Sequence, residues 1–532
     1  MTSSGIKQRY TWIFYAGVLL ALLPIMIFRD FTPDNELRYL SITDEALRNH
    51  NFFAFYNHGI PYADKPPLYF WFLMLCRWIA GQHYMWLYAL GSLIPAFGVI
   101  AVMEKWTIRW GNSADVDKAA ASHSFAFDRN TARLMLMTSA YFLGASIILR
   151  MDMLMCLFII LSLYTFWKMY VHDDRKRDRW LFPVYLFLAL FTKGPLGILI
   201  PLCSIIVFLA LKKKIRLFPK FWDWRAWGVL IGLCVAWFLA VFADGGKEYL
   251  DNLLFHQTID RAVDSFHHKR PFYYYLIAMW YILAPWSLYV IGSIIADLRK
   301  ASNLPGLQQF FITVSLTTLV LLSCISSKLQ IYFLPAVPFM VYSAVMSLPK
   351  YKDCLPAKLA LEFPLVVFVL VLPAVGAMEY FGLIDVAMPV LVYSAAAILT
   401  GGGIYGLFML KRKGVYVAVK TAAVVLLVAL FVVDFALPDF NSDMGYGAVC
   451  AKAKEISIEK NIDKIYTWRI KRSENMDVYL GKDVIILDED SIPDCSQLGK
   501  SILLTKKAGE ISPNAGRTVG VGKYAIIINE KR

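Results

Sequence analysis

Charged side chains are scarce in this sequence and unevenly spread. Only 18% of the 532 residues are Asp, Glu, Lys or Arg, whereas 58% are hydrophobic. Many apolar runs of about 17 residues or more carry almost no charge. Soluble domains average about 25% charged residues, and a helix needs about 20 apolar residues to cross a bilayer. This pattern excludes an ordinary soluble protein and predicts a large membrane-spanning helical bundle followed by a polar tail.

The sequence also lacks any organised cysteine pattern. Its eight cysteines are scattered without a C-x-x-C pair, and most fall inside the apolar runs. This spacing excludes a zinc knuckle and a disulfide framework. Only Cys450 and Cys495 lie in the polar tail, where they could form a disulfide if the tail is extracytoplasmic.

Acidic residues are too few to balance the basic ones, and the net charge is +14. In a soluble protein this excess would suggest binding to nucleic acid. Here the basic residues lie in short loops between apolar runs, where charge sets the orientation of the chain in the membrane. We therefore exclude nucleic acid as a partner.

About thirteen spans are predicted from the apolar runs. No small-residue cleavage site follows the first run, so we expect it to stay as an uncleaved span. The predicted spans are 10–28, 83–104, 133–149, 153–171, 180–195, 197–211, 226–243, 273–295, 309–325, 331–348, 363–382, 389–410 and 417–437. Every second connection is basic, which places the N-terminus in the cytoplasm and the tail outside.

The connections and the tail complete the predicted architecture. Residues 1–440 form an all-α polytopic membrane bundle, and two of its outer loops, 29–82 and 244–272, are long enough to suggest function. Residues 441–532 form a small extracytoplasmic α/β domain, with a helix near 445–460. Its short β-type runs lie at 463–468, 483–488, 501–505 and 523–528. The tail has no nucleophile elbow and no phosphate-binding glycine loop, so we assign it no chemistry.

The first outer loop contains two groups of charged residues. F-T-P-D-N-E-L-R-Y puts Asp34, Glu36 and Arg38 just outside the membrane face. A carboxylate beside an arginine stays ionised and could act as a base or orient an acceptor; the alternative is a helix cap with a surface ion pair. Y-A-D-K-P-P places Asp64 and Lys65 before two prolines that fix the backbone. This lysine could hold a phosphate or anchor the chain at the interface.

Two further charged motifs lie between spans near the outer face. Arg150 and Asp152, in L-R-M-D-M-L, are wedged in an apolar setting where charges form a structural pair or serve a function. Lys193, in T-K-G-P-L-G, could hold a phosphate or cap its span. Gly194 and Gly197 beside it allow a backbone or a ligand to approach closely.

The second long loop adds histidines. In H-H-K-R-P-F-Y-Y-Y, His267 and His268 could bind zinc together with Asp64, although no dedicated zinc motif is present. The alternative for these histidines is an ordinary solvated loop. Arg270 follows them beside an aromatic belt, a setting that suits a lipid phosphate group.

Cations therefore gather at the outer face, where the distribution of topology-setting charge does not predict them. S-S-K-L-Q-I-Y-F-L-P adds Lys328, with Tyr332 one helical turn later. Interface anchoring is the alternative for each cation alone. Together they fit an anionic lipid substrate bound at the outer leaflet.

Taken in order, these stretches resemble the aminoarabinose lipid A transferases and the bacterial protein O-mannosyltransferase-like enzymes of the GT-C class. The similarity covers most of residues 10–350 and runs through P-D-N-E-L-R-Y, N-H-G-I-P-Y-A-D-K-P-P-L-Y-F-W, R-M-D-M, T-K-G-P, H-H-K-R-P-F-Y-Y-Y and S-K-L-Q-I-Y-F-L-P. It implies a GT-C fold with a small periplasmic C-terminal domain, located in the bacterial inner membrane.

The resemblance also implies residue roles. Asp34 corresponds to the first-loop catalytic carboxylate and Asp152 to the second acidic residue, while Asp64 and one of His267 or His268 match the positions of a structural zinc. The implied residues around the carrier phosphate and the cavity are Arg38, Tyr62, Lys65, Lys193, Arg270, Lys328 and Tyr332. The relatives usually read P-D-E-x-R-Y, whereas Asn35 is inserted here, so Glu36 stays an alternative to Asp34. They also usually have glutamate where this chain has Asp64.

The implied reaction moves a sugar from a polyprenyl (undecaprenyl) phosphate to lipid A or another envelope glycolipid, with 4-amino-4-deoxy-L-arabinose as the first candidate. An acceptor oxygen displaces the carrier phosphate at the anomeric carbon with inversion, and basic side chains stabilise the leaving group. No nucleotide cofactor is required. One alternative is a protein acceptor, as for the O-mannosyltransferase-like enzymes. A lipid or sugar transporter is disfavoured, because the sequence has no internal repeat and its polar groups gather at one face.

Overall fold

A computed structural model describes residues 3–111, 127–172, 176–254, 270–299, 304–383, 388–495, 497–511 and 516–530. The chain divides into two compact units. The bundle unit comprises Met1–Leu23, Ala63–Tyr69 and Tyr88–Val433. The tail unit comprises Pro24–Tyr62, Phe70–Leu87 and Asp434–Arg532.

The bundle unit is built from helices, as its long apolar runs predict. Its elements are α1 (Ser3–Phe28), α4 (Met85–Trp110), α5 (Arg129–Met137), α6 (Ala140–Ile147), α7 (Asp152–Tyr170), α8 (Lys176–Lys193), α9 (Leu196–Leu211), η1 (Ile215–Leu217), α10 (Phe218–Phe221), α11 (Trp224–Asp251), α13 (Tyr274–Ile282), α14 (Ser287–Leu298), α15 (Gly306–Cys324), η4 (Gln330–Ala336), α16 (Val337–Tyr351), α17 (Leu355–Tyr380), α18 (Val390–Lys413) and α19 (Val415–Val433). α1 ends in the tail unit, and α4 begins there.

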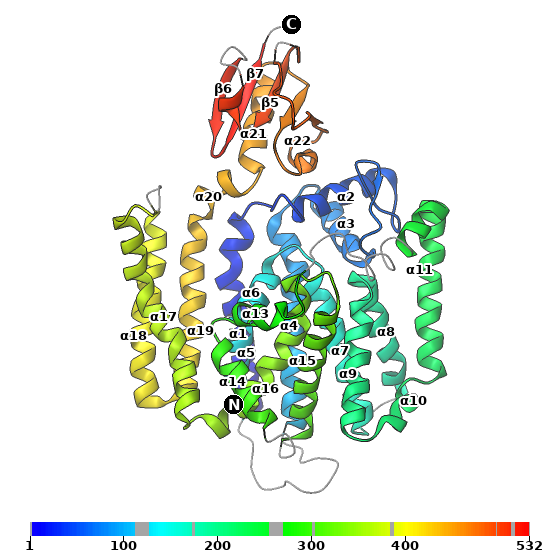
Figure 1. Cartoon of the computed structure of the whole chain (residues 1–532), viewed down its shortest axis with the longest axis vertical. Coiled ribbons are helices and arrows are strands. Elements are labelled where there is room, and N and C mark those ends of the chain that lie inside the picture. The colour runs from blue at the N-terminus through cyan, green and yellow to red at the C-terminus, as the bar shows by residue number, and fades with distance from the viewer. Residues whose placement is uncertain are drawn as a thin grey trace. The chain divides into compact units, whose positions relative to one another are not determined.

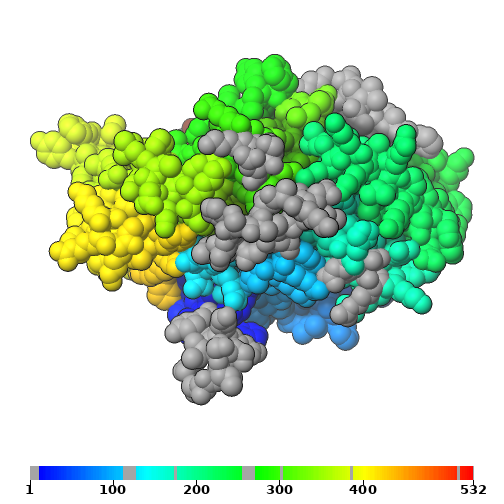
Figure 2. Space-filling model, turned by 90° about the horizontal axis from the view of Figure 1, so that it is seen from below, coloured from blue at the N-terminus to red at the C-terminus, as the bar shows by residue number. Residues whose placement is uncertain are grey.

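Helices that follow one another along the chain also pack together in the bundle unit. α7, α8 and α9 form one group, with α15 against α9. α17, α18 and α19 form a second group, and the two groups occupy different sides of the unit in both views (Figures 1 and 2). Close packing depends on small residues: a Cβ at Gly402 on α18 would lie 2.3 Å from the Val425 side chain on α19. Short connections make such neighbours antiparallel.

Two of the predicted spans are interrupted. The run 133–149 forms α5 and α6, and the run 273–295 forms α13 and α14. The hydroxyl of Thr138 bonds back to the preceding turn where α5 ends. Pro285 lies between α13 and α14, and a proline disfavours helical backbone at the residue before it. Trp286 Nε1 donates to Thr138 Oγ1 at 3.0 Å, so the two breaks contact each other.

The predicted count of thirteen spans can be compared with the helices that are both long and apolar. In the described residues, nine helices are long and apolar enough to cross a membrane. The predicted pair 180–195 and 197–211 is present as α8 and α9, but neither is among these nine. The count of thirteen therefore stays a prediction.

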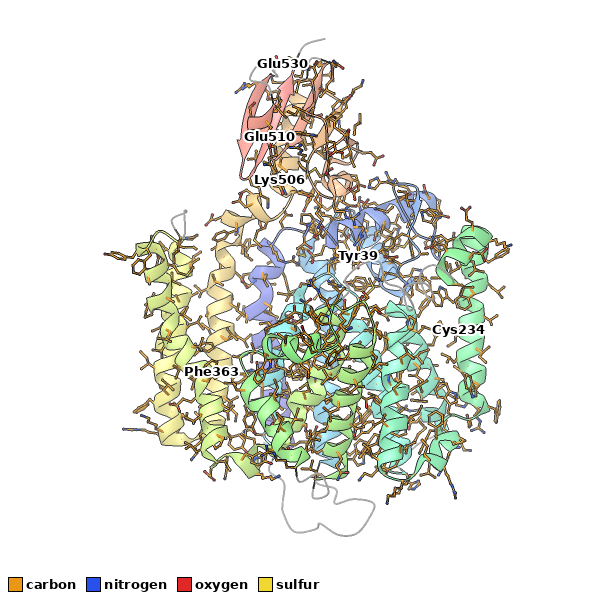
Figure 3. The ribbon with its side chains drawn as sticks, viewed as in Figure 1. Tyr39, Cys234, Phe363, Lys506, Glu510 and Glu530 are labelled. Carbon is orange, nitrogen blue, oxygen red and sulfur yellow. The ribbon has the colours of Figure 1, made fainter. Side chains whose placement is uncertain are left out.

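Large apolar side chains cover the outside of the bundle unit. Leu359, Phe363 and Leu370 on α17 are all exposed, and Phe363 is labelled in Figure 3. Soluble proteins rarely expose apolar faces of this extent, whereas lipid tails would cover them. Together with the nine apolar helices, this surface identifies a multi-pass membrane protein.

The tail unit combines the first outer loop with the C-terminal residues. Its elements are α2 (Glu36–Asn49), β1 (Tyr56–Asn57), β2 (Ile60–Pro61), α3 (Leu68–Ala80), η5 (Asp434–Ala436), α20 (Leu437–Met444), α21 (Gly447–Glu459), β3 (Ile465–Trp468), η6 (Ser473–Met476), α22 (Asp477–Leu480), β4 (Ile485–Ile486), β5 (Ser501–Thr505), η7 (Ala508–Glu510), β6 (Arg517–Val521) and β7 (Tyr524–Asn529). The sheet order is β4-β3-β5-β7-β6. β3 pairs in parallel with β4 and β5, and β7 is antiparallel to β5 and β6. The predicted small α/β tail is confirmed, whereas the predicted domain division between residues 440 and 441 stays a prediction.

Asp30 joins the two parts of the tail unit. Its carboxylate accepts hydrogen bonds from the backbone N–H of Gly447 at 2.8 Å and from the hydroxyl of Tyr479. A Cβ at Gly445 would lie 1.9 Å from the same carboxylate, so the close approach requires glycine there. The first outer loop and the C-terminal residues are therefore parts of one folded structure.

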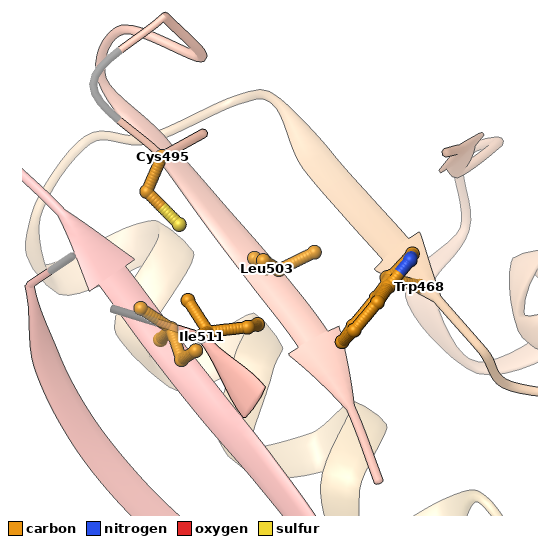
Figure 4. Close-up of a cluster of buried hydrophobic side chains, with 5 residues drawn as sticks. Trp468, Cys495, Leu503 and Ile511 are labelled. Carbon is orange, nitrogen blue, oxygen red and sulfur yellow. The ribbon is translucent and has the colours of Figure 1, made fainter. Parts of the chain in front are cut away.

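The sheet of the tail unit has its own apolar core. Trp468, Cys495, Leu503, Ile511 and Ile527 form one buried cluster, with Cys495 at one end of it (Figure 4). Cys450, on α21, is buried as well, and both thiols are free. The disulfide considered for this pair is therefore not formed in the structure. Burial raises the pKa of both thiols, which makes them poor nucleophiles.

Candidate active site

Asp152 is the centre of a buried ion cluster in the bundle unit. Its carboxylate accepts from Lys193 Nζ through one oxygen and from Arg150 Nε at 3.1 Å through the other. The side chains of Asp152 and Lys193 are only 1% and 6% exposed. The sequence predicted the neighbouring pair of Arg150 and Asp152, and the structure adds Lys193 as a second partner.

Helix ends place these charges together. Asp152 is the first residue of α7 and Lys193 the last residue of α8, and these two helices pack against each other. The positive end of the α7 dipole favours a carboxylate, and the negative end of the α8 dipole favours a cation. Ser92 Oγ, from α4, donates to the backbone oxygens of Ile148 and Arg150 at 2.6 and 3.2 Å, which fixes the chain just before α7.

The T-K-G-P motif makes a tight turn after Lys193. Gly194 has a positive φ of 112°, and its N–H bonds back to the last turn of α8. A Cβ at Gly197 would lie 2.4 Å from the backbone of Ala189, so α9 starts in direct contact with α8. In the structure, Gly197 therefore allows the backbones of α8 and α9 to approach each other closely.

Lys65 belongs to the same cluster. It lies in the Ala63–Tyr69 segment of the bundle unit and is near enough to Asp152 and Lys193 to interact with both electrostatically. Pro66 and Pro67, which follow it, are buried. Three cations, Lys65, Arg150 and Lys193, therefore lie around the carboxylate of Asp152.

Tyr332 covers one side of this cluster. The Nζ of Lys193 lies 4.5 Å from the centre of the Tyr332 ring, within the range of a cation–π contact. Lys328, from the same motif, is buried and donates to the backbone oxygen of Ile325. Of the two residues predicted from this motif, Tyr332 contacts the cluster, and Lys328 is engaged with its own turn.

Asp34 and Glu36, the two candidate carboxylates of the first loop, have opposite environments in the tail unit. Glu36 is fully buried, forms a two-pronged pair with Arg29 at 2.7 Å and accepts from Thr32 N–H at 2.8 Å. Asp34 is 58% exposed and forms a surface pair with Lys471 at 3.1 Å. Asp34 is therefore open to an incoming group, and Glu36 is held by its neighbours.

Arg38 and Tyr62 meet in the tail unit. The guanidinium of Arg38 lies 5.7 Å from the centre of the Tyr62 ring, and its Nη2 donates to Asn35 Oδ1 at 2.8 Å. The Nε of Arg38 is buried and has no hydrogen-bond partner within the described ranges. Asn35, the residue inserted relative to the usual motif, is thus used to hold this arginine.

The second outer loop is only partly described. Arg270 is exposed and lies near Tyr274, with which it interacts electrostatically. His267 and His268 lie outside the described residues. Asp64, their predicted partner for zinc, is half-buried, so the predicted metal site stays a prediction.

The sequence interpretation missed several partners of the predicted residues. Arg29 holds Glu36, and Lys471 in the tail holds Asp34. Arg29 directly follows an apolar run, a position that favours an anchoring or functional cation. Nothing in the local sequence indicates that Lys471 lies near a residue more than four hundred positions earlier.

Comparison with known proteins finds similar sequences among curated proteins and similar folds among solved structures. No protein-family model matches the chain. Undecaprenyl phosphate-alpha-4-amino-4-deoxy-L-arabinose arabinosyl transferase from Yersinia enterocolitica is 26% identical over 332 residues, which are 61% of this chain and 56% of that protein. The same-named protein of Yersinia pestis is 24% identical over 337 residues, 60% of this chain and 55% of its own. The chain thus spans little more than half the length of these relatives.

The fold comparison extends over nearly the whole chain. The crystal structure of ArnT from Cupriavidus metallidurans bound to undecaprenyl phosphate superposes with a TM-score of 0.75 and 16% identity, and covers 99% of this chain and 98% of ArnT. This chain has the fold of the aminoarabinose transferases. The apo form of ArnT gives a TM-score of 0.74. The predicted resemblance to this GT-C family, and the predicted membrane bundle with a small C-terminal sheet, are confirmed.

Proposed function

We propose that this protein is a membrane glycosyltransferase that moves a sugar from a polyprenyl phosphate, in the first instance undecaprenyl phosphate, to lipid A or another envelope glycolipid. The proposed sugar is 4-amino-4-deoxy-L-arabinose. The names of the curated relatives support this donor and sugar, and the ArnT structure supports a site for undecaprenyl phosphate on this fold.

The gathering of three cations around Asp152 is the observation that carries the proposal. Cations placed next to apolar helices usually mark a functional site, and their charge favours an anionic ligand. The Asp152 carboxylate holds Lys193 and Arg150 in place, where they could also contact a phosphate. Arg150 supplies a planar donor pair for phosphate oxygens, while Lys65 and Lys193 act as point charges.

The chemistry is a single displacement at the anomeric carbon. The bond from this carbon to the carrier phosphate oxygen breaks as the bond to the acceptor oxygen forms, so the configuration inverts. Negative charge grows on the leaving phosphate, and the cations of the cluster stabilise it more in the transition state than in the bound donor. A hydroxyl acceptor must also lose a proton, whereas an ionised phosphate acceptor has none to lose.

We assign the acceptor role to Asp34 rather than to Glu36. Glu36 accepts three hydrogen bonds from Arg29 and Thr32, and a carboxylate held in this way is a weak base. Asp34 is open to solvent and could orient the acceptor or take its proton. Arg38, beside Asp34 in the sequence, has a buried nitrogen without a partner in the described residues, which suits a contact to substrate.

We also propose the metal set predicted from the sequence, Asp64 with His267 or His268, as a structural zinc site. A half-buried carboxylate is a suitable oxygen donor for zinc. The proposed reaction has no step at this metal, because the cations of the cluster already stabilise the leaving phosphate.

We further propose an inner-membrane location with the N-terminus in the cytoplasm and the tail unit in the periplasm. Two native cysteines test this topology, because Cys324 ends α15 and Cys354 precedes α17, and both are exposed. An impermeant maleimide added to intact spheroplasts should label a variant whose single cysteine is Cys324. A variant whose single cysteine is Cys354 should be labelled after lysis but not before it. The reverse pattern would contradict the orientation.

The function is tested by mass spectrometry of lipid A and the other envelope glycolipids from cells with and without the gene. We expect one sugar to be lost from a glycolipid and to be restored by the wild type. Restoration with Lys193→Met should fail, because this change removes one of the cluster cations. A sugar lost from glycoproteins instead would indicate a protein acceptor, and no loss from any envelope glycan would contradict the proposal.

A further inference from the structure

A second cluster of potential ligands lies in the tail unit. His58 is in the turn between β1 and β2, Asp477 begins α22, and Asp483 follows the glycine that ends α22. One donor atom from each residue lies within 4.8 Å of the other two. Within the described ranges, this is the one group of three such side chains. It shares no residue with the metal set predicted from the sequence.

Hydrogen bonds around His58 assign its ring nitrogens. Ser41 Oγ donates its single proton to Asp477 Oδ2 at 2.9 Å, so it must accept from His58 Nε2 at 3.2 Å. In a neutral imidazole, Nδ1 then carries a lone pair. This Nδ1 faces Asp483 Oδ1 at 3.3 Å. Two acceptors at that distance repel each other unless a cation or a proton lies between them.

The carboxylate of Asp477 provides a second, independent observation that points to a bound cation. Its side chain is only 8% exposed, and its Oδ1 is buried without a hydrogen-bond partner in the described part of the chain. A buried carboxylate oxygen without a partner is energetically costly. Asp477 and Asp483 also line a cavity of about 1040 Å³, which gives an ion and its water ligands a path to the cluster.

We propose that His58, Asp477 and Asp483 bind a divalent cation of the zinc class. Zn–N and Zn–O bonds of about 2.0–2.1 Å give a tetrahedral edge of roughly 3.3 Å, which matches the distance between His58 Nδ1 and Asp483 Oδ1. The Asp477 carboxylate provides the third ligand, and water from the cavity the fourth. Ser41 orients both His58 and Asp477 from behind, as partners of metal-bound side chains do.

The backbone holds His58 ready for this role. His58 and Gly59 have positive φ of 54° and 75°, as a two-residue hairpin turn requires. Asn, Asp and Gly are favoured at the first of these positions, so histidine there has a conformational cost. The carboxylate of Glu45 offsets it by accepting from the N–H groups of His58 and Gly59 at 2.7 and 3.0 Å. The proposed ion would then tie this hairpin to the C-terminal part of the tail unit.

The test uses purified full-length protein in detergent, stripped with a chelator and dialysed against Zn²⁺ alone, with bound zinc measured by mass spectrometry. The key variant is His58→Asn. Its matched control is His50→Asn, because His50 has a φ of 57° in the same unit and also lines the cavity. Asparagine tolerates this backbone conformation in both variants.

We expect wild type and His50→Asn to bind one zinc more per chain than His58→Asn. Asp483→Asn should lose the same equivalent, and its side chain is 72% exposed, so the change cannot disturb the core. Ser41→Ala should weaken zinc binding by about 10–100-fold. His267 and His268 are also replaced in each of these variants, which removes the metal set predicted from the sequence. The remaining difference in zinc content then reports on the His58 site alone. Equal zinc content in wild type, His58→Asn and Asp483→Asn would overturn the proposal, and would leave the proposed sugar transfer untouched.

Discussion

The protein contains two aspartate–lysine pairs with similar atoms and opposite surroundings. Asp152 and Lys193 meet in the bundle unit with 1% and 6% of their side chains exposed. Asp34 and Lys471 meet in the tail unit with 58% and 73% exposed. An exposed pair contributes about 0–1 kcal/mol, whereas leaving one partner of a buried pair without the other costs about 3–5 kcal/mol.

The difference in exposure suits the two carboxylates to different roles, one structural and one in contact with substrate. A buried carboxylate with two cations on it cannot leave them at low cost, so Asp152 fixes the positions of Lys193 and Arg150. An exposed carboxylate can exchange its lysine for a substrate group with little loss. This difference supports the proposed roles, in which Asp152 arranges charge for a phosphate and Asp34 meets an acceptor.

The largest effect is expected for Asp152→Asn. The change removes the negative charge that holds Lys193 and Arg150, so donor binding geometry and folding should both suffer. We expect sugar transfer to fall at least about 100-fold and the Tm in detergent to fall by several degrees. Transfer from a synthetic polyprenyl phosphate sugar and thermal unfolding are the measurements.

Asp178→Asn is the matched control for that change. Asp178 on α8 pairs with Lys168 on α7 at 2.5 Å, and both are nearly buried. It therefore removes a similar ion pair from the same two helices. A comparable drop in Tm with transfer largely retained would assign the loss in Asp152→Asn to the site. Equal loss of transfer in both variants would show that Asp152 acts only through stability.

Smaller effects are expected for the two first-loop carboxylates, and these effects should divide between activity and stability. Asp34→Asn should lower transfer to a hydroxyl acceptor about 100-fold and leave the Tm unchanged, because its pair is exposed. Glu36→Gln should lower the Tm, since Arg29 loses its charged partner in a buried setting. If Glu36→Gln abolishes transfer in protein that unfolds normally and Asp34→Asn does not, the assignment is reversed.

Acid should weaken the tail unit through Asp44. Burial alone would raise the pKa of Asp44, but hydrogen bonds and charge from His83 and Arg77 outweigh it and hold the pKa below its ordinary value of 3.8. A lowered pKa in the folded state gives stability that is present above the ordinary value and lost as pH falls below it. The Tm of the wild type should therefore drop more steeply below about pH 4 than that of Asp44→Asn. Parallel curves would exclude Asp44 as the source.

The smallest effect is expected for Lys471→Met. Its pair with Asp34 is exposed to solvent, so the free energy of unfolding should change by less than about 0.5 kcal/mol. Other surface pairs of the tail unit, such as those of Glu510 and Glu530 (Figure 3), have similarly exposed carboxylates. A large loss of stability in Lys471→Met would mean that exposure does not separate the two pairs.

Features set by local sequence could be predicted, and features set by long-range packing could not. The tail helix predicted at 445–460 is α21, and four of the five strands of the sheet match predicted β-type runs. β6 was missed because R-T-V-G-V is short, holds a glycine and is mostly exposed. The interruptions at Thr138 and Pro285 were also missed, since apolar composition continues through both.

The same limit applies to the site. Adjacent charges such as Arg150 and Asp152 were predicted to pair, because two residues of spacing already brings them close. Lys193 was predicted as a phosphate ligand but not as a partner of Asp152, which lies 41 positions earlier. The link of Ser41 to Asp477 spans 436 positions. Apolar periodicity indicates that helices form but does not indicate which helix ends meet.

The hydrogen bonds of the Asp30 carboxylate determine when the first outer loop can finish folding during synthesis. Its bond to Gly447 joins residues 417 positions apart, so it cannot form until nearly all of the protein has been made. At about 5–20 residues per second, the first outer loop waits roughly 20–80 s after its own synthesis. During that interval Asp30 and the buried face of α2 have no tail to fold against. A ribosome stalled before the last hundred codons would therefore leave a membrane-inserted chain whose first loop stays open to proteases and chaperones.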